Sequence, residues 1–462
     1  MPRMIRCRRN TSGVAAALGL LALALGGILE PGGSAWAGGP LVVGGTFGPP
    51  GQPFTWDISL GEVQYRTDGG GLGVLSNSEA NDLVAAMFQV WEDVPTAAIG
   101  FNRLGQITGL ADGNVETLAE FDRVVGRCEA GSQSPIIYDK QGALFSVLFG
   151  PGSGVIGFAG PCQVSNGGRI VSALVALNGG FLDGQTFNGE LTGNEFEAVF
   201  IHEFGHFFGL DHSQVNLNCL FGCASGSDDA FGLPTMFPFL ISGLTEVPGV
   251  HPARTLSMDD LAWVSRLYPD PSFSSSYGTI SGTILFSDGL TPAQGVNVIA
   301  RRVNDLGTTE NESRRFAVSV VSGYRFTGNP GQSVTGTNTG GSPFGSHDPA
   351  LIGAFEIPVP PGAYTIEVEG LSAAFQGGSS VGPLDPPFPN PGAQEFWNVG
   401  EANDDPTYLS SPVTVAAGAT ASGIDIILNG TPRRLDAFEI VRLWLRESLA
   451  PWLRENREWV RG

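Results

Sequence analysis

Charged residues are scarce in this chain of 462 residues, and basic residues are the scarcer kind. They make up 15% of the sequence, with 24 Lys and Arg against 45 Asp and Glu, and the formal net charge is −21 at pH 7. An excess of negative charge repels phosphate groups. We therefore expect no nucleic acid and no anionic membrane surface among the partners of this protein.

Long hydrophobic runs are also missing, apart from one near the N-terminus. Residues 1–37 combine a basic start, the apolar stretch Val14–Leu29 and the small-x-small sequence Ala35-Trp36-Ala37, which is typical of a secretory signal peptide. An uncleaved anchor is the less favoured alternative, because about 16 apolar residues are short for a membrane span. Cleavage removes four Arg and one Glu, so the mature chain carries a formal charge of −24. We expect it to be secreted, extracellular or associated with the cell surface.

Cysteine is rare, with five residues in the chain, and Cys7 leaves with the signal peptide. An even number of cysteines in an oxidising compartment predicts two disulfides among the remaining four. Three pairings are open, and the preferred one joins Cys219 to Cys223 and Cys128 to Cys162, since a separation of four residues can close a small local loop.

The length favours two or three domains, and 67 Gly with 32 Pro favour turn-rich β structure over long helices. Residues 38–270 have the pattern of a mixed α/β (α+β) unit, and residues 271–277 that of a linker. Hydrophobic periodicity predicts strands at Val63–Arg66, Pro135–Asp139 and Ile170–Leu177, and helices at Asn77–Trp91 with N-cap Ser78, Asn194–Gly209, and Ser257–Leu267 with N-cap Ser257.

From residue 278 to 430 the pattern changes to short alternating strands between turn residues, which is typical of a small antiparallel all-β sandwich. Two Gly/Pro/Ser-rich stretches, about Asn304–Pro349 and Ser372–Ser411, are predicted to be loops or a partly ordered insertion. Residues 431–462 form a tail whose periodicity predicts a C-terminal amphipathic helix. The predicted strands are Gly278–Phe286, Val296–Arg302, Ala354–Pro358, Ala363–Gly370 and Ile424–Leu428.

Three of the five histidines lie within the eleven residues from His202 to His212. Four residues of an α-helix advance by about 400°, so His202 and His206 project from one face, one turn apart. Gly209 can end the helix and turn the chain back, which lets His212 supply a third nitrogen. Three neutral ligands and an open fourth position predict a catalytic Zn²⁺ site. Glu203 is placed to reach a metal-bound water without being a ligand.

The sequence His-Glu-x-x-His-x-x-Gly-x-x-His, followed by Met236 in Pro234–Pro238, resembles the zinc-binding signature of the metzincin metalloproteases. His212-Ser213, Met236-Phe237-Pro238 and Leu256–Leu261 are similar to the matrixin branch, and the resemblance covers roughly residues 54–269. It implies a zinc endopeptidase acting on proteins or peptides, with Glu203 as the base. It also implies a Met-turn at Met236, a substrate edge strand near Gly154–Gly160 and a pocket at Phe237, Pro238, Phe239, Leu240 and Ile241.

The chain departs from typical matrixins in three respects. The stretch between His212 and Met236 is longer and holds Cys219 and Cys223. No histidine cluster matches a second, structural zinc, so the resemblance implies one Zn²⁺ only. The interval between Ala37 and Phe54 leaves no room for a propeptide, so latency through a Cys–zinc bond is not expected.

The second half has its own resemblance. Gly278–Ile284, Phe355–Pro358 and Pro360–Ile366 are similar to the carboxypeptidase regulatory-like, transthyretin-like domains of secreted proteins. That fold does not dictate what it binds, and a surface or matrix ligand is the partner considered for this domain. We expect this domain to fold alone and to be dispensable for the cleavage of short peptides.

Several readings stay open at the sequence level. Ca²⁺ is a second candidate cofactor, because Asp139 beside Gly142 and Asp183 beside Gly184 could be fragments of calcium loops, but ordinary turn chemistry explains both equally well. His251 and His347 are expected to be solvated loop residues. The rival function is a non-catalytic secreted adhesion or matrix-binding protein that uses the sandwich, and the intact Glu203 favours the enzyme. Zinc-dependent hydrolysis of a non-peptide substrate is a third reading.

Overall fold

The structure is a computed structural model of the chain. It describes residues 38–45, 48–126, 133–185, 189–244, 251–303, 312–326, 337–338, 346, 348–370, 384–385 and 395–429. The predicted signal peptide 1–37, Cys128, His347 and the predicted C-terminal helix in 431–462 lie outside these residues. Among the helices of the described part, none has the length and apolar character that a membrane span requires.

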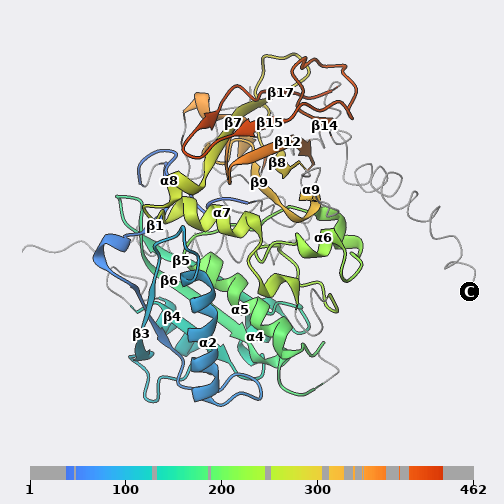
Figure 1. Cartoon of the computed structure of the whole chain (residues 1–462). Coiled ribbons are helices and arrows are strands. Elements are labelled where there is room, and N and C mark those ends of the chain that lie inside the picture. Colours follow the sequence, from blue (N-terminus) through green and yellow to red (C-terminus); the bar gives the residue numbers. More distant parts are fainter. Residues whose placement is uncertain are drawn as a thin grey trace, which may run out of the picture.

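A six-stranded, mostly parallel sheet organises the described chain up to about residue 180 (Figure 1). Its strands lie in the order β1-β6-β4-β2-β3, and β5 flanks β6 as the one antiparallel strand. Within the described residues β5 pairs with β6 alone, so β5 forms an edge of the sheet. The strands are β1 (Thr55–Trp56), β2 (Val63–Thr67), β3 (Phe101–Gln106), β4 (Pro135–Asp139), β5 (Gly157–Val164) and β6 (Arg169–Asn178).

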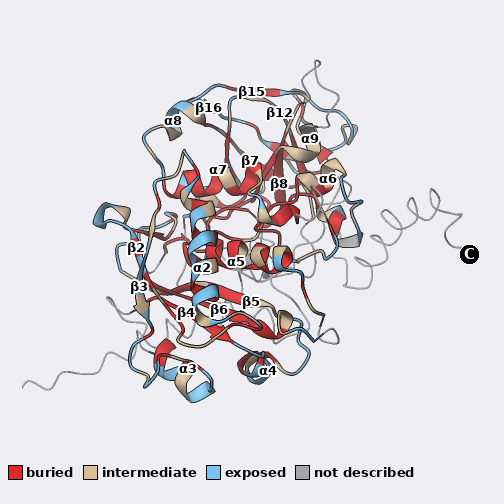
Figure 2. Ribbon diagram, turned by 60° about the horizontal axis from the view of Figure 1, so that its bottom comes forward, coloured by how far each residue is buried: buried red, intermediate tan, exposed pale blue. Residues whose placement is uncertain are grey.

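Helices cover both faces of this sheet (Figure 2). The side chains of β6 alternate between two cores: Ala173, Val175 and Leu177 join the larger cluster with α2 and α5, whereas Leu174 and Ala176 join a smaller cluster with α3 and α4. This alternation is the period of two that a strand imposes. The helices of the described chain are α2 (Asn77–Glu92), α3 (Leu118–Val125), α4 (Ala143–Phe149), α5 (Gly193–Phe207), α6 (Asp228–Phe231), α7 (Met258–Leu267), α8 (Phe273–Ser276) and α9 (Glu312–Arg315).

The N-cap of α2 differs from the prediction. Ser76 is the cap, not Ser78, because Glu79 stands three residues after Ser76 and its carboxylate accepts the Ser76 N–H at 2.8 Å. The Ser76 hydroxyl accepts the Glu79 N–H in return, which completes a capping box that Ser78 cannot form. The predicted cap Ser257 of α7 is confirmed.

Two further sheets follow, and their apolar faces share one buried cluster that includes Ile284, Ile357 and Ile366. Two findings correct the sequence prediction. The sandwich is not wholly antiparallel, because β16 and β17 run parallel to β7. The expected loop 304–349 contains β9, a buried five-residue strand whose short apolar run is flanked by polar sequence.

One sheet has the order β11-β7-β16 with β17 also on β7, the other the order β14-β12-β8-β9 with β15 on β12. A separate pair joins β10 to β13. The strands are β7 (Gly278–Leu285), β8 (Asn297–Arg302), β9 (Ala317–Val321), β10 (Thr337–Asn338), β11 (Ala354–Val359), β12 (Gly362–Glu369), β13 (Leu384–Asp385), β14 (Glu395–Phe396), β15 (Val413–Val415), β16 (Thr420–Ala421) and β17 (Ile426–Ile427).

Helix α7 lies between the two halves (Figure 1). Trp263 Nε1 donates to the carbonyl of Ser319 on β9 at 2.9 Å, and Asp259 accepts the Ser319 N–H at 2.6 Å. The segment 271–277, expected to be a linker, instead contains the short helix α8 and the buried Tyr277. A single buried core therefore runs through both halves.

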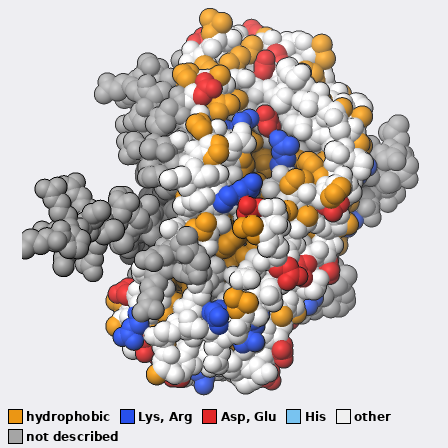
Figure 3. Space-filling model, turned by 90° about the vertical axis from the view of Figure 1, so that its left-hand side faces the viewer, with side chains coloured by type: hydrophobic (Ala, Val, Ile, Leu, Met, Phe, Trp, Pro, Cys, Tyr) orange, Lys and Arg blue, Asp and Glu red, His pale blue; other side chains and the backbone are white. Residues whose placement is uncertain are grey.

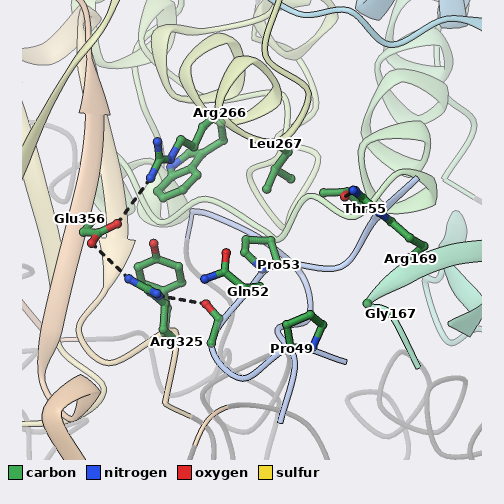
Figure 4. A pocket seen from close by; sticks show the side chains of 14 residues that line it. Pro49, Gln52, Pro53, Thr55, Gly167, Arg169, Arg266, Leu267, Arg325 and Glu356 are labelled. Carbon is green, nitrogen blue, oxygen red and sulfur yellow. Dashed lines mark hydrogen bonds and ion pairs between the residues drawn. The ribbon is translucent and has the colours of Figure 1, made fainter. Parts of the chain in front are cut away.

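A cavity of about 510 Å³ opens at this junction (Figure 4). Glu356 of β11 lies 3.1 Å from Arg325 and 3.6 Å from Arg266, and Arg325 also donates to the carbonyl of Gly51 at 2.9 Å. None of the predicted site residues lines this cavity. The face of the molecule in Figure 3 carries side chains of both charges among apolar ones, so the acidic excess does not make that face uniformly negative.

Candidate metal centre

Helix α5 positions the first two histidines. It begins at the N-cap Thr192, which forms a capping box with Glu195, and ends at Phe207. His202 and His206 lie one turn apart on it, and His206 is buried. Gly209 then takes a φ of 98°, a conformation that a residue with a Cβ rarely adopts. The chain turns back at this glycine and brings His212 to the other two histidines.

The three imidazoles meet through their Nε2 atoms. The distances are 3.0 Å between His202 and His212, 3.1 Å between His202 and His206, and 3.0 Å between His206 and His212. Nitrogen ligands 2.0–2.1 Å from a tetrahedral zinc lie about 3.3 Å apart. The triangle is thus close to the size that one Zn²⁺ requires, and these residues form one of two groups in the described chain that could hold a metal ion.

The hydrogen-bond partners of the Nδ1 atoms determine whether the Nε2 atoms carry a proton or a free lone pair. His202 Nδ1 lies 2.8 Å from the carbonyl of Thr235, and His206 Nδ1 lies 2.8 Å from the carbonyl of Leu210. A carbonyl only accepts, so each Nδ1 carries the proton and each Nε2 presents a lone pair. Lone pairs that converge at about 3 Å repel one another unless a cation lies between them. The donor set therefore fits a metal ion.

Burial keeps these imidazoles neutral, which is the form that binds metal. It lowers the pKa of His202 to about 4 and the pKa of His206 to about 3. The pKa of His212 is also lowered well below its usual value, mainly by burial and then by the neighbouring His206. The site is consequently ready to bind a cation at neutral pH without losing protons from its nitrogens.

Glu203 follows His202 on α5, and burial alone accounts for the shift of its pKa. Its side chain is only 6% exposed, and its Oε2 has no hydrogen-bond partner among the described residues. Burial raises the pKa of Glu203 to about 8. The carboxyl group packs against Gly157 at the start of β5, where a Cβ would lie 2.7 Å from Oε1. A buried carboxyl with a displaced pKa beside a metal site is a candidate general base.

Met236 lies directly under this region. It is 2% exposed and packs on Gly205 of α5, where any side chain would collide with the Met236 sulfur. Its carbonyl accepts the N–H of Ser213, the residue after His212, at 2.7 Å. The predicted Met-turn thus contacts both the helix and the return segment that carry the three histidines.

Asp260 of α7 holds the turn in place, a role that the sequence did not reveal. Its carboxylate accepts the N–H groups of Thr235 at 2.8 Å, Met236 at 3.0 Å and Ser257 at 2.8 Å. Since the carbonyl of Thr235 binds His202, a chain of contacts runs from α7 through the turn to a metal ligand. The only available signal was the acidic residue at the third position of a helix, which capping alone explains.

The predicted pocket residues differ in accessibility. Phe237 is buried in a small cluster with Cys219 and Leu233, whereas Phe239 is 46% exposed. Pro238, Leu240 and Ile241 are partly buried.

The disulfide between Cys219 and Cys223 is confirmed, with Cα atoms 4.7 Å apart. Cys162 is also disulfide-bonded, and its expected partner Cys128 lies outside the described residues.

The residues considered for calcium serve ordinary turns. Asp139 accepts the N–H of Phe145 at the start of α4, and Asp183 accepts the N–H of Gln185, both at 2.8 Å. His251, expected to be solvated, is instead buried. Its Nε2 lies 3.0 Å from the carbonyl of Ile241, so it fastens this loop to the molecule.

Comparisons with known proteins found no relative. The chain matches no family model and none of the curated proteins.

Proposed function

We propose that this protein is a secreted zinc endopeptidase of the metzincin type, with a matrixin-like catalytic half. The observation that carries the proposal is the convergence of three Nε2 atoms beside the buried oxygen of Glu203 that has no hydrogen-bond partner among the described residues. Three protein ligands leave a fourth position open, which distinguishes a catalytic from a structural zinc. His202, His206 and His212 would hold the ion.

A zinc ion bound in this way supplies a Lewis acid for the scissile carbonyl and a water of lowered pKa. The residues of the chain perform the proton transfer. Glu203 accepts the proton of the attacking water and delivers it to the nitrogen of the leaving amine. Met236 gives the site an apolar floor, and Asp260 keeps His202 oriented through the carbonyl of Thr235.

The edge strand β5 supports a peptide as the substrate. Its first residue, Gly157, contacts Glu203, and in the described chain its outer edge pairs with no other strand. An extended peptide can add to such an edge through main-chain hydrogen bonds, which places a peptide bond next to the metal centre. This strand overlaps the expected edge at Gly154–Gly160. The exposed Phe239 favours an apolar side chain near the cut bond.

Replacing Glu203 by Gln tests the mechanism. The variant keeps the size of the side chain and all three ligands but removes the base, so cleavage of a peptide library should fall by about 10²–10⁴-fold. The zinc content, measured by atomic absorption, should remain one ion per chain. His206→Ala is the matched control, because it should lose the zinc as well as the activity.

The two measurements separate the rival readings. Wild-type protein that binds zinc but cleaves no peptide would support the binding-protein alternative, in which the sandwich carries the function. Full activity of Glu203→Gln with zinc bound would show that another group activates the water.

A further inference from the structure

A second group of possible metal ligands lies far from the histidines, in the sandwich. Carboxylate oxygens of Glu395, Glu401 and Asp405 all lie within 4.8 Å of one another. Glu395 belongs to β14, and the other two follow in the loop after it. Two oxygens on opposite sides of a Ca²⁺ ion lie about 5 Å apart, since each Ca–O distance is 2.3–2.6 Å. The cluster therefore has the dimensions of one calcium site.

The protein leaves ligand atoms in this cluster without partners. Glu395 is only 2% exposed, yet its Oε1 has no hydrogen-bond partner among the described residues. The buried Oδ1 of Asn429, whose N–H binds the other oxygen of Glu395 at 3.0 Å, also has none. A buried acceptor without a donor costs free energy, and a carboxylate costs more than a neutral group. A cation bound between the three carboxylates would satisfy the Glu395 oxygen.

No basic group balances this charge. Residues 395–429 contain no Lys, Arg or His, and the ion pairs of the described chain include none of the three carboxylates. Three carboxylates so close together repel one another, and a bound cation would remove this repulsion.

We propose that Glu395, Glu401 and Asp405 bind one Ca²⁺ ion. All the ligands are oxygens, which Ca²⁺ and Mg²⁺ prefer over zinc and other transition metals. Calcium suits the site better than magnesium, because the protein itself offers several carboxylate oxygens, whereas Mg²⁺ retains most of its water.

The site connects parts of the sandwich that are distant in the sequence. Glu401 accepts the N–H of Ile427 on β17 at 2.9 Å, and Asn398, which is buried, donates its own N–H to Glu401 at 2.8 Å. A bound ion would tie the loop after β14 to the last strand of the sandwich. Calcium should therefore stabilise the folded state by mass action.

Calorimetric titration of the zinc-saturated full chain with CaCl2 tests the proposal. One Ca²⁺ per chain should bind, and a free concentration of a hundred times the Kd should raise the unfolding temperature by about 3 °C. Asp405→Asn and Glu395→Gln should each lose most of this shift. Asp404→Asn is the matched control, because Asp404 is exposed, lies one residue away and does not belong to the cluster.

Calcium should also reverse the order of stability of the wild type and a variant, and this reversal does not depend on how stable the variant is overall. Without calcium, Glu395→Gln should be at least as stable as the wild type, because it removes one negative charge and keeps an acceptor oxygen for the N–H of Asn429. With calcium it should be the less stable of the two. Equal calcium shifts in the wild type and in Asp405→Asn would overturn the proposal, as would an equal response to Mg²⁺ or no response to either cation.

Discussion

At the scale of single residues, the carboxyl group of Glu203 depends on the absence of a side chain opposite it. A Cβ at Gly157 would lie 2.7 Å from Oε1 and 2.8 Å from Cγ of Glu203. Such distances are shorter than any normal contact, so either the strand or the carboxyl group would have to move. A displacement of about 1 Å at a catalytic group can cost about 10²-fold in rate.

We therefore predict that Gly157→Ala reduces peptide cleavage by roughly 10²-fold while the zinc content stays at one ion per chain. Gly160→Ala on the same strand is the control, because its Cβ would meet only a methyl group of Leu41 at 3.7 Å, an ordinary contact. Turnover and bound zinc would be measured for both. Equal activity of the two variants would show that Gly157 does not position Glu203.

The metal ligands were predictable from sequence because their geometry is local. His202, His206 and Glu203 share one helix, and the period of the helix fixes their relative directions. Gly157 and Glu203 are 46 positions apart, and Asn429 is 34 positions from Glu395. Contacts of that kind depend on how the elements pack, which no spacing rule encodes. The same reason explains why His251 was wrongly expected to be solvated.

At the scale of elements, the turn at Met236 is held between α5 and α7. Three helices (α2, α5 and α7) and three parallel strands (β2, β4 and β6) of the first half were predicted within two residues, because their hydrophobic periods are clear. Strand β3 was not predicted, since the alternating burial of Phe101–Gln106 is weak. Strand β5 was expected only as a substrate edge at Gly154–Gly160, since Gly157–Val164 contains glycine and proline. The support that α7 gives to the turn could not be predicted, because it runs through backbone N–H groups that carry no sequence signal.

Asp260→Asn tests this support. Asparagine offers one acceptor oxygen and no charge where the carboxylate accepts three N–H groups, so the turn should loosen and His202 should lose its fixed orientation. Replacing an outer partner, that is, a residue that orients a metal ligand through hydrogen bonds, typically weakens metal binding 10–100-fold. Competition with a chromogenic chelator would measure the zinc affinity.

Thr235→Val is the control for the same turn. It removes the hydroxyl that donates to the carbonyl of Ala253 at 2.9 Å but keeps the carbonyl that binds His202. Its zinc affinity should stay within a few-fold of the wild type, although its stability should fall by about 1 kcal/mol. A loss of affinity as large as that of Asp260→Asn would mean that general loosening, and not the acceptor at Asp260, is responsible.

At the scale of the whole molecule, the sandwich contacts the segment that directly follows His212. Val215 packs with Ile299 and Ala317 of the sandwich. Asn216 has a φ of 60° and accepts from Arg301 at 3.0 Å, while its own amide donates to the carbonyls of Asp229 and Arg314.

The change of sequence pattern at residue 278 predicts two independent halves. The structure instead places a buried network between them, since Arg301 also forms an ion pair with the buried Glu367. The sequence could not predict this network, because each half has a complete hydrophobic pattern of its own. We therefore no longer expect the sandwich to be dispensable for the metal site.

The last prediction distinguishes two effects of Arg301: its contribution to the stability of the fold and its contribution to the position of His212. Arg301→Met removes the cation that pairs with the buried Glu367 and should lower the free energy of unfolding by about 3–5 kcal/mol. Adding Glu367→Met replaces the whole pair by apolar groups, which is often neutral, so the double variant should regain most of the unfolding temperature. It still lacks the donor to Asn216, so its zinc affinity should stay roughly tenfold below the wild type, at the lower end of the range for outer partners. Thermal unfolding of the zinc-free chain and chelator competition would measure the two quantities separately. Recovery of both in the double variant would mean that the sandwich stabilises the fold without positioning the third ligand, and that the metal centre belongs to the first half alone.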